Sequence, residues 1–200
     1  MNIEIDSIDL LSDDFLNGNY KKKSDRAACE EIKYAIKEYV NVNMPKDSEF
    51  VARISEHLET LLATFKNNWK ELREALEKLR EEVKHGRKQE NTYGYESTHE
   101  MPFLGLLKSE LFGQKSYEEL TENQMKVLKI LTDDVLSRLK TETSTVNFWE
   151  KTTAQQQLRS FLLKRIISSD VKKVVPDILK RRNDITQKLM DLGYQHYGRG

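Results

Sequence analysis

The longest hydrophobic pattern in the chain covers about residues 47–85. Apolar residues recur there every three or four positions with charged residues between them, which predicts one amphipathic helix with a single buried stripe. The stripe comprises Phe50, Ile54, Leu58, Leu61, Leu62, Phe65, Trp69, Leu72, Leu76, Leu79 and Val83. At 1.5 Å per residue, such a helix spans about 55–60 Å, which exceeds one small core. We therefore expect a helical bundle organised on this helix, with Asn67 and Asn68 as the point where it can kink.

Shorter segments with the same periodicity precede and follow this pattern. Thr121 and Gln124 have the spacing of a capping box, and Pro102 and Gly113 suit the start and end of a helix. The further helices are expected at residues 24–41, 102–112, 121–139, 152–166 and from 176 onward, with a turn at Asp170. Since no alternating β-branched run persists, the predicted fold class is all-α.

The same pattern predicts three regions. Residues 1–23 are expected to be a weakly ordered segment because their composition is polar and contains a turn signal. Residues 24–112 form the predicted long-helix hairpin region, in which the polar stretch 87–101 is a mobile loop. Residues 113–200 form the predicted C-terminal helical bundle.

Composition limits the classes of function. The 33 basic residues balance the 33 acidic ones, so any contact with nucleic acid or membrane must come from a local patch. Cys29 is the only cysteine, which excludes a disulfide framework and a thiolate metal cluster. No stretch reaches the roughly 18 apolar residues of a membrane span, and the first residues lack a signal pattern. We expect a cytoplasmic protein without membrane contact.

A search for catalytic and cofactor motifs finds none. Phosphate-binding glycine loops are absent, and the four histidines lack the His-Glu-x-x-His spacing. A Ser–His–Asp grouping stays open, although no serine lies on a Gly-x-Ser-x-Gly turn. Glu82 and Lys84 have the Glu-x-Lys spacing of a nuclease motif, but on a helix they diverge by about 200°. The expectation is no catalytic residue, no metal and no cofactor in this chain.

Two groups of residues are candidates for partner contacts. Phe148 and Trp149 precede a helix, where an aromatic pair either packs in the core or anchors a docking partner. Seven basic residues form the densest cationic group, which is either a solvated face or a DNA-backbone contact. They are Lys164, Arg165, Lys172, Lys173, Lys180, Arg181 and Arg182.

The order of segments resembles the C-terminal region of the motor (R) subunit of type I restriction enzymes. Residues 47–59 are similar to that family's Asp-Pro-x-Phe-Tyr-x-x-Leu-Ser-Glu-Arg-Leu-Glu stretch, and residues 65–69 stand where it has a Phe-Lys-Gly-Asn-Trp-like segment. The segments 24–36, 102–107 and 146–149 also resemble family segments, and the likeness covers about residues 24–168. Beyond Ser169 the chain departs from the family pattern, which has a Tyr-Pro-containing turn.

The resemblance implies a function by assembly. In that family, other domains hydrolyse ATP with Mg²⁺, translocate DNA and cleave it, while this helical region docks the motor on the methyltransferase-specificity core. The expected partners are therefore the methyltransferase and specificity subunits, and possible contacts to DNA backbone are secondary. The alternative is a stand-alone nucleic-acid-binding module that uses the basic C-terminal helices. The salt dependence of binding distinguishes the two functions, because the affinity of a protein with six to ten phosphate contacts falls by about three to five decades between 50 and 200 mM salt.

Overall fold

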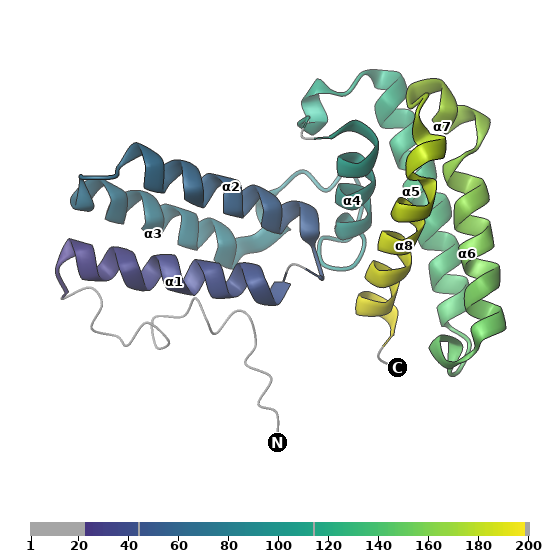
Figure 1. Ribbon diagram of the computed structural model, residues 1–200, viewed down its shortest axis with the longest axis horizontal. Helices are drawn as coiled ribbons and strands as arrows, with labels where there is room; N and C mark the ends of the chain where they lie inside the picture. Colours follow the sequence, from purple (N-terminus) through teal and green to yellow (C-terminus); the bar gives the residue numbers. More distant parts are fainter. Residues whose placement is uncertain (1–22, 44, 114, 199–200) are drawn as a thin grey trace. The chain divides into compact units, whose positions relative to one another are not determined.

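The computed structural model describes residues 23–43, 45–113 and 115–198, and Figure 1 shows their helices. Within these ranges there are eight α-helices and no β-strand, so the all-α prediction is confirmed. The chain divides into two compact units: unit 1 comprises residues 1–44 and 48–91, and unit 2 comprises residues 45–47 and 92–200. The segment expected to be weakly ordered, 1–23, lies outside the described residues except for Lys23.

Unit 1 is a three-helix assembly. It contains α1 (Asp25–Asn43), α2 (Ser48–Thr64), α3 (Trp69–His85) and the short 3-10 helix η3 (Gly86–Gln89). Helix α1 packs against both α2 and α3, which lie alongside it in Figure 1. Each helix contributes one apolar stripe to a shared core: Ala28, Cys29, Ile32, Ala35, Ile36, Phe50, Ile54, Leu58, Leu72, Leu76, Leu79 and Val83.

The single long helix expected over residues 47–85 is wrong, because the chain reverses between Thr64 and Trp69. The Asn68 side chain accepts a hydrogen bond from the backbone N–H of Glu71 and so caps α3. Asparagine favours such caps and turns because its side chain competes for backbone hydrogen bonds. The apolar spacing nevertheless continues through the turn, because the stripes of α2 and α3 both face the core that α1 completes.

A buried ion pair closes the open end of this hairpin. The Arg87 side chain is 3% exposed and lies 2.5 Å from the carboxylate of Glu49 at the start of α2. It also pairs with Glu90 at 2.9 Å and lies over the ring of Phe50. The two ends of the hairpin are thereby joined by a charge-assisted contact whose donor is almost fully withdrawn from water.

Unit 2 is built around a helix that is apolar on nearly every side. This helix, α4 (Met101–Phe112), buries all of its first eight residues. Around the same core lie η4 (Tyr117–Glu119), α5 (Glu122–Thr143), η5 (Phe148–Glu150), α6 (Thr152–Ile166), α7 (Ser169–Val174) and α8 (Ile178–Tyr197). Helices α5 and α8 both pack on α4, and each also packs on α6. Because α4 supplies so much apolar surface, its neighbours need only one buried stripe each.

Three boundaries differ from the sequence-based expectations. The division between the units lies at residues 91 and 92 rather than after 112, because α4 packs with the helices that follow it. Asp170 lies within the short helix α7 instead of starting a turn. Pro176 lies outside the last helix, which begins at Ile178.

The polar stretch 87–101 is a loop as expected, apart from the end of η3 and the first residue of α4. Part of it is anchored on α5. The buried Tyr95 hydroxyl donates to a carboxylate oxygen of Asp133 at 2.7 Å, and the Lys129 ammonium donates to the carbonyl of Tyr93 at 3.1 Å. Desolvation and the hydrogen bond to Asp133 raise the pKa of Tyr95, so its hydroxyl stays protonated and remains a donor.

Replacing Leu76 with alanine tests the core of unit 1. Leu76 is fully buried, so Leu76→Ala is expected to lower the free energy of unfolding by about 2–5 kcal/mol through lost burial and a residual cavity. The measurement is urea denaturation followed by circular dichroism. The same deletion at Leu179, which is 48% exposed, is the control and is expected to cost less than about 1 kcal/mol. A loss of less than about 1 kcal/mol in Leu76→Ala, no larger than in the control, would show that the stripe of α3 is not part of a core.

Candidate functional site

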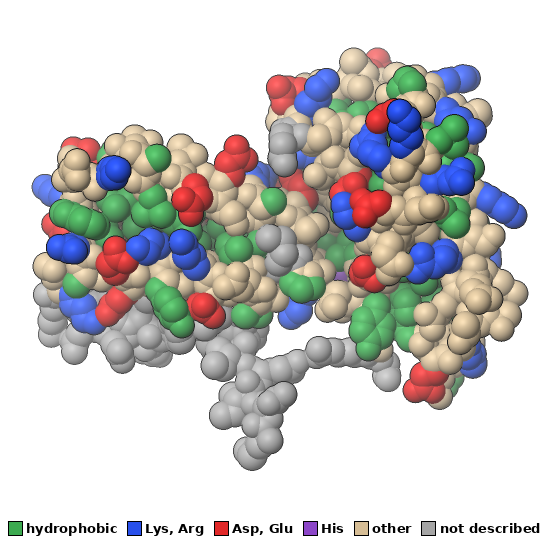
Figure 2. Space-filling model, in the orientation of Figure 1, with side chains coloured by type: hydrophobic (Ala, Val, Ile, Leu, Met, Phe, Trp, Pro, Cys, Tyr) green, Lys and Arg blue, Asp and Glu red, His purple; other side chains and the backbone are tan. Residues whose placement is uncertain are grey.

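The seven basic residues identified from the sequence lie on three consecutive elements of unit 2. Lys164 and Arg165 end α6, Lys172 and Lys173 belong to α7, and the remaining three lie in the first turns of α8. Figure 2 shows Lys and Arg side chains spread over the part of this face that α6 and α7 form, with few acidic groups among them. Residues 164–182 contain only two acidic residues, Asp170 and Asp177.

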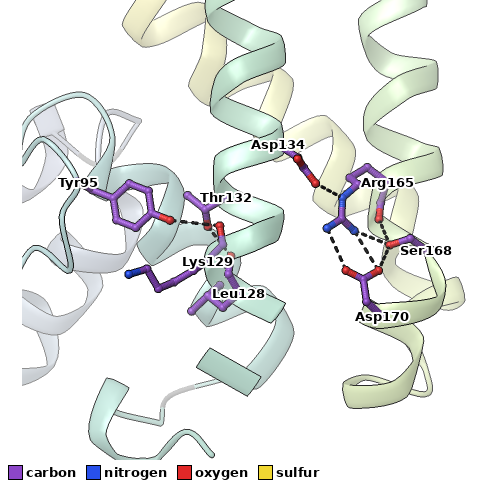
Figure 3. Close-up of polar contacts among 8 residues, drawn as sticks. All are labelled: Tyr95, Leu128, Lys129, Thr132, Asp134, Arg165, Ser168 and Asp170. Atoms are coloured by element: carbon purple, nitrogen blue, oxygen red, sulfur yellow. Dashed lines mark hydrogen bonds and ion pairs between the residues drawn. The ribbon is translucent and has the colours of Figure 1, made fainter. Parts of the chain in front are cut away.

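Arg165 is occupied by contacts inside unit 2. Its guanidinium donates to both carboxylate oxygens of Asp170, at 3.2 and 3.0 Å, and to Asp134 of α5 at 2.6 Å. It also donates to the hydroxyl of Ser168, and Figure 3 shows this guanidinium between the two carboxylates. Arg165 therefore joins α5, α6 and α7 and is not a free cation for a partner.

The charges of this cluster are fixed near neutral pH. Burial disfavours the ionised form of Asp170, but hydrogen bonds from Ser168 and Arg165 outweigh it and lower the pKa of Asp170 below its ordinary value. Burial likewise disfavours the charged guanidinium of Arg165, yet its hydrogen bonds to Asp134 and Asp170 raise its pKa. The bidentate contact consequently joins a full negative and a full positive charge.

Arg181 is also engaged within unit 2. Its guanidinium donates to the carboxylate of Asp177 at 3.0 Å and to the backbone carbonyl of Glu110 at the end of α4. Asp177, the second acidic residue of the segment, is thus paired with Arg181. Both acidic charges in residues 164–182 are matched within the protein.

Five of the seven cations remain without an ion-pair partner among the described residues, and all five side chains are exposed. We call these five the basic surface: Lys164, Lys172, Lys173, Lys180 and Arg182. Seven basic residues minus the two paired arginines give five unpaired positive charges within 19 residues of a chain whose net charge is zero. The arrangement is suited to contact with successive anionic groups.

Unit 1 has the opposite local charge. A cleft of about 780 Å³ is lined there by five glutamates and only two cationic side chains, in the set Arg53, Glu74, Glu77, Lys78, Glu81, Glu82, His85, Gly86 and Glu90. An anionic polymer is repelled by such a lining. Contact with an anionic partner is consequently expected at the basic surface of unit 2 and not at this cleft.

The aromatic pair Phe148 and Trp149 packs mainly inside unit 2. Phe148 is 2% exposed, so it does not present an anchor to a docking partner. The Trp149 ring is partly buried, and its N–H donates to the carbonyl of Tyr197 at 3.1 Å. Its edge meets Tyr194, which is 53% exposed. Tyr194, which contacts Trp149, is therefore the exposed aromatic residue next to this pair. The sequence pattern did not single it out.

The structure brings together two histidines that are 97 residues apart. The Nδ1 atoms of His99 and His196 are 3.4 Å apart, and His196 Nε2 lies 2.8 Å from the carbonyl oxygen of Lys46. Because a carbonyl only accepts, Nε2 of His196 carries the proton and its Nδ1 accepts from His99 when His196 is neutral. Sequence spacing carried no signal for this pair, since the contact depends on how α8 packs beside the start of α4.

In the described ranges, no group of three or more His, Cys, Asp or Glu side chains is arranged to hold a metal ion. Glu82 and Lys84 lie on α3, so they diverge as the helical geometry requires. None of the helices described combines the length and apolar character needed to cross a bilayer.

Comparison with known proteins adds no relative. No family model matches the chain, and neither the curated proteins nor the solved structures contain a match.

The histidine pair predicts a pH-dependent stability. Desolvation, reinforced by His99, lowers the pKa of His196 below 6.5, although the bond to Lys46 opposes this. A lowered pKa means that the folded state favours neutral His196, so this contribution is present above pH 6.5 and is lost as the pH falls below it. Urea denaturation is expected to give a lower free energy of unfolding for unit 2 at pH 5.5 than at pH 7.5. His196→Gln is expected to make this difference smaller.

The matched control is His57→Gln on α2, which should leave the decline in place because His57 belongs to unit 1. An unchanged pH profile in His196→Gln would contradict the role given to the histidine pair.

Proposed function

We propose that this chain is a non-catalytic helical assembly module whose basic surface contacts the phosphate backbone of DNA. The observation that carries the proposal is the division of the seven cations: Arg165 and Arg181 pair with the acidic residues of the segment, and five exposed cations remain. Lysine-rich surfaces position nucleic acid through its phosphates and do not read its sequence. The proposed contact is consequently independent of base sequence.

The assembly that we propose is the one that the resemblance implies. In it, the helical module docks an ATP-dependent translocase and nuclease on the methyltransferase-specificity core of a type I restriction complex. Several of the residues that carry the resemblance lie in the core, among them Phe50 and Ile54 of α2, Phe103 and Leu104 of α4, and Phe148 before α6. Their burial supports a shared helical framework, while the partner contacts are left to exposed residues.

The proposal assigns no catalytic residue, metal or cofactor to this chain. ATP and Mg²⁺ are used by other domains of the resembled subunit. Turnover of ATP, or cleavage of DNA, by the purified chain would contradict this part of the proposal. The alternative of a stand-alone nucleic-acid-binding module uses the same five cations, and it differs in requiring no protein partner.

Salt titration tests the contact with DNA. If all five cations contact phosphates of a duplex, the logarithm of the association constant should fall with the logarithm of salt concentration with a slope of about −4.5. Between 50 and 200 mM salt the affinity then decreases about 500-fold. Fluorescence anisotropy with labelled 20-base-pair duplexes of two unrelated sequences measures both the slope and the expected lack of sequence preference.

The control variant replaces all five residues of the basic surface with alanine. Their exposure predicts an unchanged circular-dichroism spectrum and a slope near zero. A wild-type slope near zero, or a variant that binds as tightly as the wild type, would exclude the basic surface as the phosphate contact.

Docking is tested separately by a pull-down with methyltransferase and specificity subunits. Tyr194→Ala is expected to weaken capture, because exposed tyrosines are frequent anchors of protein interfaces. The five-alanine variant is the control, and it is expected to retain capture in the absence of DNA. Equal loss of capture in both variants would show that docking and DNA contact are not divided between these surfaces.

A further inference from the structure

A small cleft lies beside the basic surface, between the first turns of α5 and the start of α7. Its volume is about 220 Å³, and its lining comprises Asn123, Lys126, Val127, Ile130, Ser169, Asp170 and Lys173. Only Lys173 belongs to the basic surface, so the cleft brings in a second lysine, Lys126 of α5, which lies outside the seven basic residues identified from the sequence. Lys126 is exposed and has no ion-pair partner among the residues described here.

The lining of this cleft is suited to one tetrahedral anion. Lys126 and Lys173 approach from two different helices, and Asn123 and Ser169 add neutral side chains that donate hydrogen bonds. Ile130, which is 42% exposed, supplies an apolar side chain at the same cleft. A phosphodiester has this combination of features, since its charged oxygens are flanked by apolar sugar carbons.

One lining residue opposes an anion, and its charge is paired inside the protein. Asp170 is ionised, but both of its carboxylate oxygens accept from the Arg165 guanidinium. Counting Lys126, Lys173 and Asp170 gives a charge of +1, and including Arg165 together with its second partner Asp134 leaves it at +1. Figure 3 shows Arg165 reaching Asp170 beside Ser168.

We infer that this cleft seats one phosphate group of a nucleic-acid backbone, with Lys126 and Lys173 as its direct contacts and Arg165 as a positioning residue that neutralises Asp170. This inference rests on the proposed function and makes it more specific. It adds Lys126 to the contact surface and gives Arg165 a role without direct contact to the ligand. It also gives one phosphate of the nucleic acid a defined position beside the basic surface.

The first experiment compares two variants with equal loss of charge. Lys126→Ala/Lys173→Ala removes both cleft cations, whereas Lys164→Ala/Lys180→Ala removes two exposed cations that do not line the cleft. The probe is a labelled 20-base-pair duplex at 100 mM salt. The matched variant loses two ordinary phosphate contacts, and the cleft variant is expected to lose at least about threefold more affinity than the matched variant does.

The second experiment tests Arg165 through a double-mutant cycle with Asp170. Arg165→Gln leaves the Asp170 charge unpaired beside the phosphate, so affinity for the duplex is expected to fall about threefold to tenfold. Adding Asp170→Asn removes that charge and is expected to restore affinity to within about twofold of the wild type. A purely structural role for Arg165 predicts no such rescue. Arg165→Lys keeps the positive charge and is expected to bind nearly as well as the wild type.

The outcomes separate this inference from the proposed function. If the two paired-alanine variants lose affinity equally, or if Asp170→Asn fails to rescue Arg165→Gln, the phosphate seat is wrong while the basic surface stands. If the wild-type chain does not bind the duplex even at 50 mM salt, both are wrong. Thermal unfolding of each variant by circular dichroism identifies any variant that has lost its fold, and the exposed Lys126→Ala/Lys173→Ala pair is not expected to do so.

Discussion

Unit 2 depends on the burial of α4, the most apolar helix of the chain. Its side chains are buried nearly all round and belong to one core with those of α5, α6 and α8. The surrounding helices bury one stripe each, and their outer faces are therefore available for charged residues. Gly193 favours the close approach of α8 to α5, because a Cβ there would lie 2.8 Å from the Leu139 side chain, which would have to shift. Packing thus fixes which faces of α6, α7 and α8 are exposed.

Charge pairing then divides the cations that lie on these faces. Arginine can hold a carboxylate through two parallel N–H···O contacts, as Arg165 does with Asp170, and both acidic residues of this segment pair with arginine. Arg165 and Arg181 hold Asp170 and Asp177, whereas the lysines remain solvated. A chain with a net charge of zero consequently carries a local positive surface, because its acidic residues in this segment are already matched. The cleft of unit 1 is the converse case, because its five glutamates give it a locally negative lining.

The hairpin of unit 1 shows how periodicity alone can mislead. The apolar spacing from Phe50 to Val83 is continuous, and neither glycine nor proline interrupts it. The turn depends on Asn68, whose capping contact is a weak local signal compared with eleven apolar positions in register. What selects two helices over one is the core completed by α1, since a straight helix would place half of the stripe beyond the reach of α1.

The sequence by itself determined the all-α class, most helix positions and the cluster of seven cations, because amphipathic periodicity, capping residues and local charge density are short-range properties. Tertiary structure alone decided which cations are free, since the partners of Arg165 and Arg181 include Asp134 of α5 and Glu110 of α4. It also decided the burial of Phe148, the contact of His99 with His196 and the presence of Lys126 beside Lys173. These pairs are distant in sequence, and their proximity results from packing on the core and not from local preference.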